Sequence, residues 1–180
     1  MSKEQTTNEE FDQAASNLSK FVTDMAGKTA AEKGFVWTAT PDAPDTYDKL
    51  TAAYKRSIQT GEPMPVSSLY CDRVIYQKPS QNYAMRFWHD TLHMTTGLTF
   101  ALDDELELGL HHLAIAEQNG IKRYSMEWRM LRVDLLGQNY LLGIAKRFPI
   151  DQAEFVRGCL LRGLDEGVLI EVRKTDDQVA

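Results

Sequence analysis

Apolar residues recur at intervals of three and four positions along most of this chain, which is the spacing of one face of an α-helix. The first such run covers residues 8–25 and contains these apolar positions: Phe11, Ala14, Ala15, Leu18, Phe21, Val22 and Met25. Gly27 follows this run and could end the helix. The same spacing predicts further helices over residues 46–60, 80–96, 103–119, 125–147 and 151–166.

The predicted helices are bounded by residues that favour helix ends. A side chain able to cap a helix start stands at four of them: Asp45 or Thr46, Ser80, Asp103 and Asp151. Glycine, which readily adopts the left-handed conformation that closes a helix, follows three of them, at Gly61, Gly97 and Gly120. The longest predicted helix, over residues 125–147, has apolar residues on more than one face and is expected to be central.

Three segments lack the helical spacing. Residues 34–45 (GFVWTATPDAPD) contain prolines and are predicted to form a loop. Residues 63–79 are expected to be irregular, with SLYCDRVIY at residues 68–76 as the one plausible short strand. VLIEVRK, at residues 168–174, is predicted to be a short strand or a docked tail. The fold class is therefore all-α, a compact bundle of about six helices with one irregular segment.

Composition narrows the classes of protein to consider. A chain of 180 residues with 43% hydrophobic content suits one domain: the polar residues 1–10 are expected to be disordered, and residues 11–180 to form a single helical domain. The net charge of −6 argues against a general nucleic-acid binder, which needs a basic surface. No apolar run approaches the roughly 20 residues of a transmembrane helix. Because the polar start does not resemble a signal peptide, we expect a cytoplasmic protein.

All four histidines lie between positions 89 and 112, and their spacing suits a metal ion. If residues 80–96 are helical, His89 and His93 lie one turn apart on the same face, with Asp90 beside them. Glu105 stands in the first turn of the next predicted helix, which would pack back antiparallel. Imidazole and carboxylate ligands suit zinc, with iron or manganese as alternatives. The sequence therefore predicts one divalent ion held by His89, Asp90, His93 and Glu105.

A solvated helix face is the alternative interpretation, since a pair of histidines one turn apart is common in helices. Four apolar residues around the polar turn argue against it: Phe87, Trp88, Leu92 and Met94. A two-metal site that adds His111 or His112 with Glu127 or Asp134 is less favoured, because the Glu-x-x-His pairs of two-metal helical bundles are missing. A phosphohydrolase of the HD type needs an upstream histidine ligand, and no histidine precedes His89.

Two further side chains are candidates for catalysis. His112 follows Glu105 by two helical turns and could orient a ligand carboxylate, or it could be a partly buried histidine bonded to a carbonyl. Arg86, one turn before His89, could hold a substrate carboxylate with two hydrogen bonds, or form a salt bridge with Asp90. His111 lies one turn after Glu107, which predicts an exposed Glu–His pair.

The pattern His89-Asp90-x-x-His93-x11-Glu105 resembles the metal motif of the coenzyme Q biosynthesis protein four family, which takes part in ubiquinone assembly. The continuation His93-x-x-Thr96-Gly97 and the preceding Arg86 are similar as well. The resemblance covers about 35 residues and departs at Asp104, where the family usually has glycine. It implies the same four ligands in an all-α fold, and chemistry on a carboxylated aromatic ring of a ubiquinone precursor.

Two functions follow from these observations. The first is a metal-binding helical protein that acts as a metal-dependent enzyme on a small carboxylated or aromatic substrate, as the resemblance implies. The second is a non-enzymatic interaction protein, with a structural metal site or none, whose partner is another protein. A homodimer is compatible with either. An open coordination position beside a pocket would favour the enzyme, and a closed shell of four protein ligands would favour the structural site.

Overall fold

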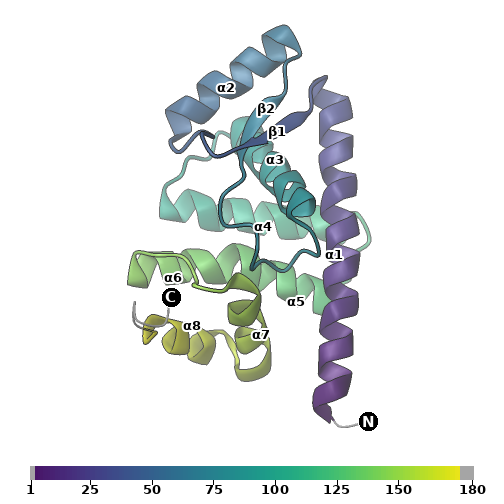
Figure 1. Cartoon of the computed structure of the whole chain (residues 1–180), viewed down its shortest axis with the longest axis vertical. Helices are drawn as coiled ribbons and strands as arrows, with labels where there is room; N and C mark the ends of the chain where they lie inside the picture. Colours follow the sequence, from purple (N-terminus) through teal and green to yellow (C-terminus); the bar gives the residue numbers. More distant parts are fainter. Residues whose placement is uncertain (1–2, 175–180) are drawn as a thin grey trace.

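The computed structural model describes residues 3–174, and the side chains of residues 8–174. This part of the chain is helical apart from a two-stranded sheet and the connecting segments (Figure 1), so the all-α prediction is confirmed. In chain order the elements are α1 (Lys3–Lys33), β1 (Trp37–Thr40), α2 (Tyr47–Thr60), β2 (Met64–Ser67), α3 (Pro79–Thr96), α4 (Leu102–Gln118), α5 (Met126–Arg132), the π-helical segment η1 (Val133–Gly137), α6 (Gln138–Ala145), α7 (Gln152–Arg162) and α8 (Leu164–Val172).

Helix α1 is longer than its sequence pattern predicts at both ends. It begins at Lys3, which places residues 3–10, expected to be disordered, in its first turns; residues 1–2 lie outside the described part. Gly27 does not end the helix, because a glycine inside a helix costs only about 1 kcal/mol. The helix ends before Gly34, whose φ of +79° is the left-handed conformation that stops a helix. One face of α1 packs along α3 and α5 (Figure 1).

The strands lie outside the segment predicted to be a short strand. β1 and β2 pair in parallel with Trp37 opposite Met64, and α2 forms the crossover between them. β1 therefore lies within residues 34–45, predicted to be a loop, and residues 68–76, predicted to include a strand, are irregular. β2 is a strand despite Pro65. Its alternate side chains, Met64 and Val66, are buried in the core, and the Met64 N–H donates a hydrogen bond to Val36 O next to β1.

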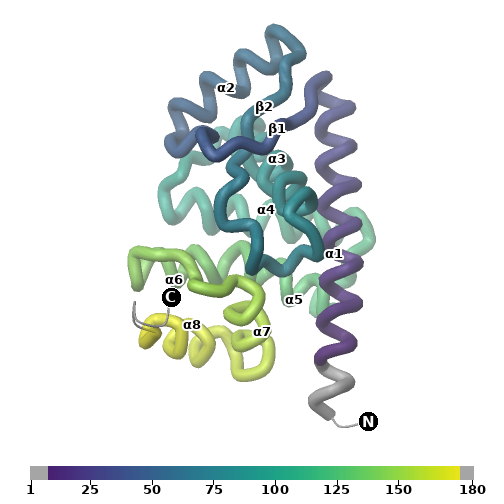
Figure 2. Tube along the Cα trace, in the orientation of Figure 1, coloured from purple at the N-terminus to yellow at the C-terminus, as the bar shows by residue number. Residues whose placement is uncertain are grey.

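The irregular segment leaves β2, descends along the molecule and returns to the start of α3 (Figure 2). It is tied to the C-terminal helices, since Arg73 O accepts hydrogen bonds from Gln152 N and Ala153 N at the start of α7. Its Ile75 and Tyr76 side chains are buried in the main core. Residues 68–76 thus provide apolar contacts without pairing as a strand.

Two apolar cores lie on either side of α3. The larger one joins α1 to the C-terminal helices and includes Leu18, Trp88, Leu131, Leu141 and Val156. The smaller one lies beneath the sheet and α2 and includes Phe35, Leu50, Met64, Val66 and Phe87. Because α3 contributes to both cores, its position is held from two sides.

The long helix predicted over residues 125–147 is present as α5, η1 and α6, which run without a break in this order. Ser125 caps its start and Lys146, with a φ of +58°, ends it. The π-helical turn η1 contains Asp134, whose side chain is buried. A π-helical turn inside an α-helix is uncommon and often occurs near functional sites.

The last described element is a helix, where the sequence pattern predicted a strand or a docked tail. α7 begins at the predicted cap, where the Asp151 side chain accepts from Glu154 N at 2.8 Å. Gly163, with a φ of +100°, then reverses the chain into α8, which takes in most of residues 168–174. The buried Glu171 side chain accepts from Ile150 N at 2.9 Å and pairs with Arg147 and Lys174. These bonds hold α8 against the end of the long helix.

Candidate metal centre

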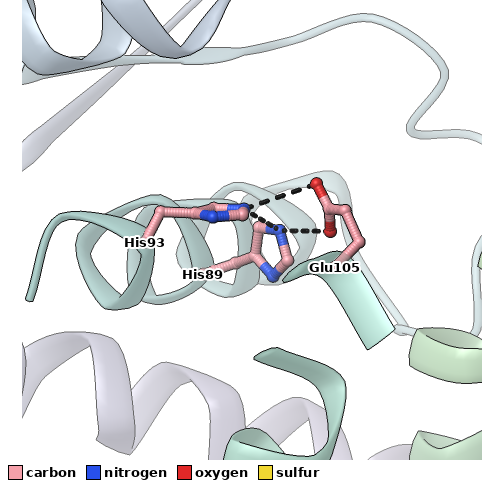
Figure 3. A group of neighbouring side chains, drawn as sticks. All are labelled: His89, His93 and Glu105. Carbon is pink, nitrogen blue, oxygen red and sulfur yellow. Dashed lines mark hydrogen bonds and ion pairs between the residues drawn. The ribbon is translucent and has the colours of Figure 1, made fainter. Parts of the chain in front are cut away.

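Helices α3 and α4 bring three predicted ligands to one point (Figure 3). Nε2 of His89 lies 3.0 Å from Nε2 of His93. The two carboxylate oxygens of Glu105 face the two rings, with Oε2 at 3.5 Å from His89 Nε2 and Oε1 at 3.4 Å from His93 Nε2. One ligand atom from each residue falls within 4.8 Å of the others. Together these three residues are called the His-His-Glu cluster below.

The connection between α3 and α4 positions Glu105. Gly97 ends α3 with a φ of +79°, and its N–H donates to His93 O at 2.9 Å, so the chain turns directly after the second histidine. The Asp104 carboxylate accepts hydrogen bonds from both the backbone N–H (2.8 Å) and the hydroxyl of Thr99. α4 starts at Leu102 after Ala101, so Asp103 is in its first turn instead of capping it as predicted. This hydrogen-bonded turn directs the Glu105 side chain toward α3.

The other predicted cap in this region is likewise displaced by two residues. α3 begins at Pro79, with Lys78 as the capping residue in place of the predicted Ser80. Pro79 suits the first helical position because it lacks the N–H that would have no partner there. Gln81 Oε1 accepts from Lys78 N at 2.8 Å, which closes the helix start.

The cluster is shielded on one side and reaches solvent on the other. His93 is fully buried, whereas the side chains of His89 and Glu105 retain 23% and 18% of their exposure. The Phe100 ring stands edge-on to His93 with centroids 5.0 Å apart. An ion or small ligand could therefore approach from the side of His89 and Glu105 and would be held against the buried His93.

The backbone determines which nitrogen of His93 faces the cluster. His93 Nδ1 lies 2.9 Å from Leu98 O. A carbonyl can only accept, so Nδ1 carries a proton, and in the neutral ring the electron pair of Nε2 faces Glu105 and His89. This is the arrangement that a metal-binding histidine requires.

Charge within the cluster favours an ionised carboxylate. Burial alone would raise the pKa of Glu105, but hydrogen bonds and charge from His89 and His93 lower it to about 2. Burial alone would lower the pKa of His89, and the facing Glu105 carboxylate raises it above its ordinary value. The carboxylate thus attracts a positive charge to the place where the three ligand atoms meet.

Asp90, the fourth predicted ligand, does not belong to this group of ligand atoms. Successive residues of a helix are rotated by about 100°, so a neighbour of His89 points to the side of the face that His89 and His93 share. Burial raises the pKa of the Asp90 carboxyl to about 6, opposed by the nearby His89, His93 and Arg86. Asp90 therefore lies near enough for its charge to act on the cluster without joining it.

Arg86 contacts the sheet and not Asp90 in the described structure. Its guanidinium donates to Ser67 O at the end of β2, and it makes no salt bridge with Asp90 among the described ion pairs. This bond joins α3 to the sheet. A role for Arg86 in holding a substrate carboxylate stays a prediction.

His112 contacts the cluster through a histidine and not through the glutamate. The ring is fully buried, and its Nε2 lies 3.2 Å from His89 Nδ1. Burial and the neighbouring histidines lower the pKa of His112 well below its ordinary value. His111, in contrast, is half-exposed, with its Nε2 at 3.8 Å from Glu107 Oε1, so the predicted exposed Glu–His pair is confirmed.

Asp134 is a buried carboxylate whose hydrogen-bond partners the sequence does not reveal. Its carboxylate accepts hydrogen bonds from Tyr76 Oη (3.2 Å), Gln138 Nε2 (2.9 Å) and Gln152 Nε2 (2.5 Å). Burial raises its pKa to about 6. These donors come from three separate segments of the chain, and they leave Asp134 outside the His-His-Glu cluster. The only sequence signal was an acidic residue within the apolar run of the central helix.

No protein-family model, curated protein or solved structure matches this chain. The likeness to the coenzyme Q biosynthesis protein four family consequently stays a resemblance of motif. Of the helices between residues 3 and 174, none combines the length and apolar character that a bilayer span requires.

Proposed function

We propose that this protein binds one divalent metal ion, zinc by preference, through His89, His93 and Glu105. The spacing of the ligand atoms carries the proposal. Zinc at 2.0–2.1 Å from tetrahedral ligands would separate those ligands by roughly 3.3 Å. The two Nε2 atoms are 3.0 Å apart, and each ring faces a different oxygen of Glu105, with Oε2 at 3.5 Å from His89 Nε2 and Oε1 at 3.4 Å from His93 Nε2. Each of these nitrogen–nitrogen and nitrogen–oxygen distances is close to a ligand separation in a zinc site, and one ligand atom from each residue lies within 4.8 Å of the other two.

The direction of the electron pairs supports the same proposal. Leu98 O accepts a hydrogen bond from His93 Nδ1–H, so in the neutral ring Nε2 presents an electron pair to the ionised Glu105 carboxylate. Acceptors that face one another in a partly buried place need a cation between them. A metal ion satisfies all three ligands at once, whereas one proton can be shared by only two of them.

The number of ligands favours a catalytic site over a structural one. Three protein ligands with a remaining coordination position are typical of catalytic zinc, which supplies Lewis acidity to a bound substrate or water. The partial exposure of His89 and Glu105 supports access from solvent. We therefore propose a metal-dependent enzyme, with the small carboxylated or aromatic substrate that the motif resemblance implies. In that role Arg86 would hold the substrate carboxylate from the same helix as the two histidines.

The second candidate function is a structural metal site in an interaction protein. The observation that favours it is the proximity of Asp90, whose charge acts on both histidines. A change of its side-chain rotamer could complete a shell of four protein ligands. In that case no coordination position would remain for a substrate.

Metal content and affinity test the proposal. Purified protein, stripped with chelator and titrated with zinc against a chromophoric competitor, is expected to bind one equivalent. The Glu105→Gln variant keeps the side-chain size but removes the charge, and should bind far more weakly. His111→Ala, which changes an exposed histidine outside the cluster, is the matched control. Failure of the unmodified protein to bind zinc, iron or manganese would overturn the proposal.

A further inference from the structure

The imidazole of His112 lies behind His89, on the side opposite the His-His-Glu cluster. The two rings are nearly parallel, with an interplanar angle of 6° and centroids 5.3 Å apart. Trp88 meets the His112 ring edge-on at 4.2 Å between centroids, and the ring is fully buried. His112 is therefore fixed by packing with its Nε2 directed at His89 Nδ1.

The two metal-facing histidines differ in what holds their Nδ1 atoms. Leu98 O holds His93, and a carbonyl can only accept a hydrogen bond. His112 Nε2 holds His89, and a neutral imidazole nitrogen can donate or accept. The proton position on His93 is thus set by the backbone, whereas the proton position on His89 depends on His112.

The Nδ1 atom of His112 differs in protonation between the two tautomers of the ring. His112 Nδ1 is buried and has no hydrogen-bond partner in the described structure. When His112 Nε2 donates to His89, the Nδ1 atom of His112 is a bare acceptor. When His112 Nε2 accepts, that same Nδ1 must carry a proton, since a neutral imidazole has one N–H.

We propose that His112 is a positioning residue whose Nε2 accepts a hydrogen bond from His89 Nδ1–H and so directs the Nε2 electron pair of His89 toward a bound metal ion. This inference rests on the proposed metal site. It adds that ion binding changes His112 from the Nε2–H to the Nδ1–H tautomer.

The proton count balances in this exchange. Before binding, His112 Nε2–H donates to His89 Nδ1, and His89 Nε2–H faces Glu105 Oε2 at 3.5 Å. On binding, the Nε2 proton of His89 leaves to water and the Nε2 proton of His112 passes to His89 Nδ1. His112 then takes up one proton from water at Nδ1. Both rings are neutral before and after, and no net proton is released by the pair.

Zinc titration of two His112 variants tests the positioning role. His112→Leu has no acceptor and should weaken zinc binding by about 10–100-fold, the usual effect of removing a partner of a metal ligand. His112→Gln offers a carbonyl oxygen to His89 Nδ1 and should keep most of the affinity. His111→Leu, the matched change at the exposed neighbour, should bind zinc like the unmodified protein.

Nitrogen-15 NMR of the imidazoles tests the tautomer directly in the unmodified protein. We expect His112 to be protonated at Nε2 without zinc and at Nδ1 with zinc, while His93 stays protonated at Nδ1 throughout. This measurement decides the matter even if His112→Leu does not fold.

Two outcomes would overturn the inference while leaving the metal site intact. They are unchanged zinc affinity in a folded His112→Leu variant, and a His112 ring that keeps its Nε2 proton when zinc is bound. Failure of the unmodified protein to bind zinc would instead overturn the proposed function itself.

Discussion

Oε2 of Glu105 lies 3.5 Å from Nε2 of His89, although the two residues belong to different helices. This approach depends on the turn after Gly97 and on the bonds between Thr99 and Asp104 that hold the turn in shape. A site built across two helices in this way couples ligand binding to the packing of α3 against α4. The coupling makes stability a readout of metal binding.

Zinc should raise the melting temperature of the protein, and chelator should reverse the rise. An ion that binds only the folded state adds about 2.7 kcal/mol at 100 times its dissociation constant, or roughly 5–10 °C for a chain of this size. His93→Ala should abolish the zinc-dependent rise, and His111→Ala should retain it. Thermal unfolding with and without zinc measures the difference. Equal rises in the two variants would show that the ligands are misassigned.

Asp90 and Glu105 should contribute unequally to metal affinity, because only Glu105 belongs to the cluster of ligand atoms. We expect Asp90→Asn to weaken zinc binding by at most about tenfold, the lower end of the effect of groups outside the ligand set. Glu105→Gln should weaken zinc binding much more than Asp90→Asn does. Competition titration of both variants checks this order. The reverse order would make Asp90 a ligand and favour the structural metal site.

Stability of the metal-free protein should respond to pH through Asp134. Burial raises the pKa of this carboxyl from 3.8 to about 6 in the folded state. Between these values the folded state binds more protons than the unfolded chain, so the free energy of unfolding falls as pH rises from about 4 to about 6, by about 3 kcal/mol. Asp134→Asn should remove this part of the slope in urea unfolding.

The comparison isolates Asp134 because other groups remain the same in both proteins. Asp90, whose pKa burial also raises to about 6, contributes in the same direction with and without the Asp134 change. The exposed Asp165 provides the control, and Asp165→Asn should leave the slope unaltered. An identical pH dependence for Asp134→Asn and the unmodified protein would contradict the assignment.

Gly167→Ala should destabilise the C-terminal pair of helices. An added Cβ would lie 2.3 Å from Cys159 Sγ and 2.8 Å from Cys159 Cα, so backbone as well as side chain would have to move. Overpacking of this kind costs about 1–3 kcal/mol. Gly158→Ala on the facing helix α7 is the control, because its Cβ would meet nothing closer than Arg162 Nη1 at 3.7 Å.

The control variant should be stabilised by about 0.5–1 kcal/mol through its greater helix propensity. Chemical unfolding of both variants measures the two free energies. If Gly158→Ala lowered the free energy of unfolding as much as Gly167→Ala does, the close approach of α7 and α8 would not explain the destabilisation.

Local features of the chain were determined by sequence alone. Helices begin or end at residues whose capping side chain or backbone freedom favours a helix end: Thr46, Gly61, Gly97, Ser125 and Asp151. These signals act within one turn of helix, where hydrogen-bond partners are neighbours in sequence. The pairing of His89 with His93 on one helix face is a feature of the same kind, and it required only that α3 be helical.

The tertiary structure decided every relationship that joins distant segments. β1 and β2 are strands because they pair with each other. Each has only four residues, and β2 contains Pro65, so neither segment carries a periodic signal of its own. Asp90 lies to the side of the α3 face that Glu105 of α4 approaches, so it is outside the cluster. His112 contacts His89 because α4 packs against α3. Sequence spacing gives the candidates for a site, but the electron pairs of His89, His93 and Glu105 meet only where packing between helices brings them together.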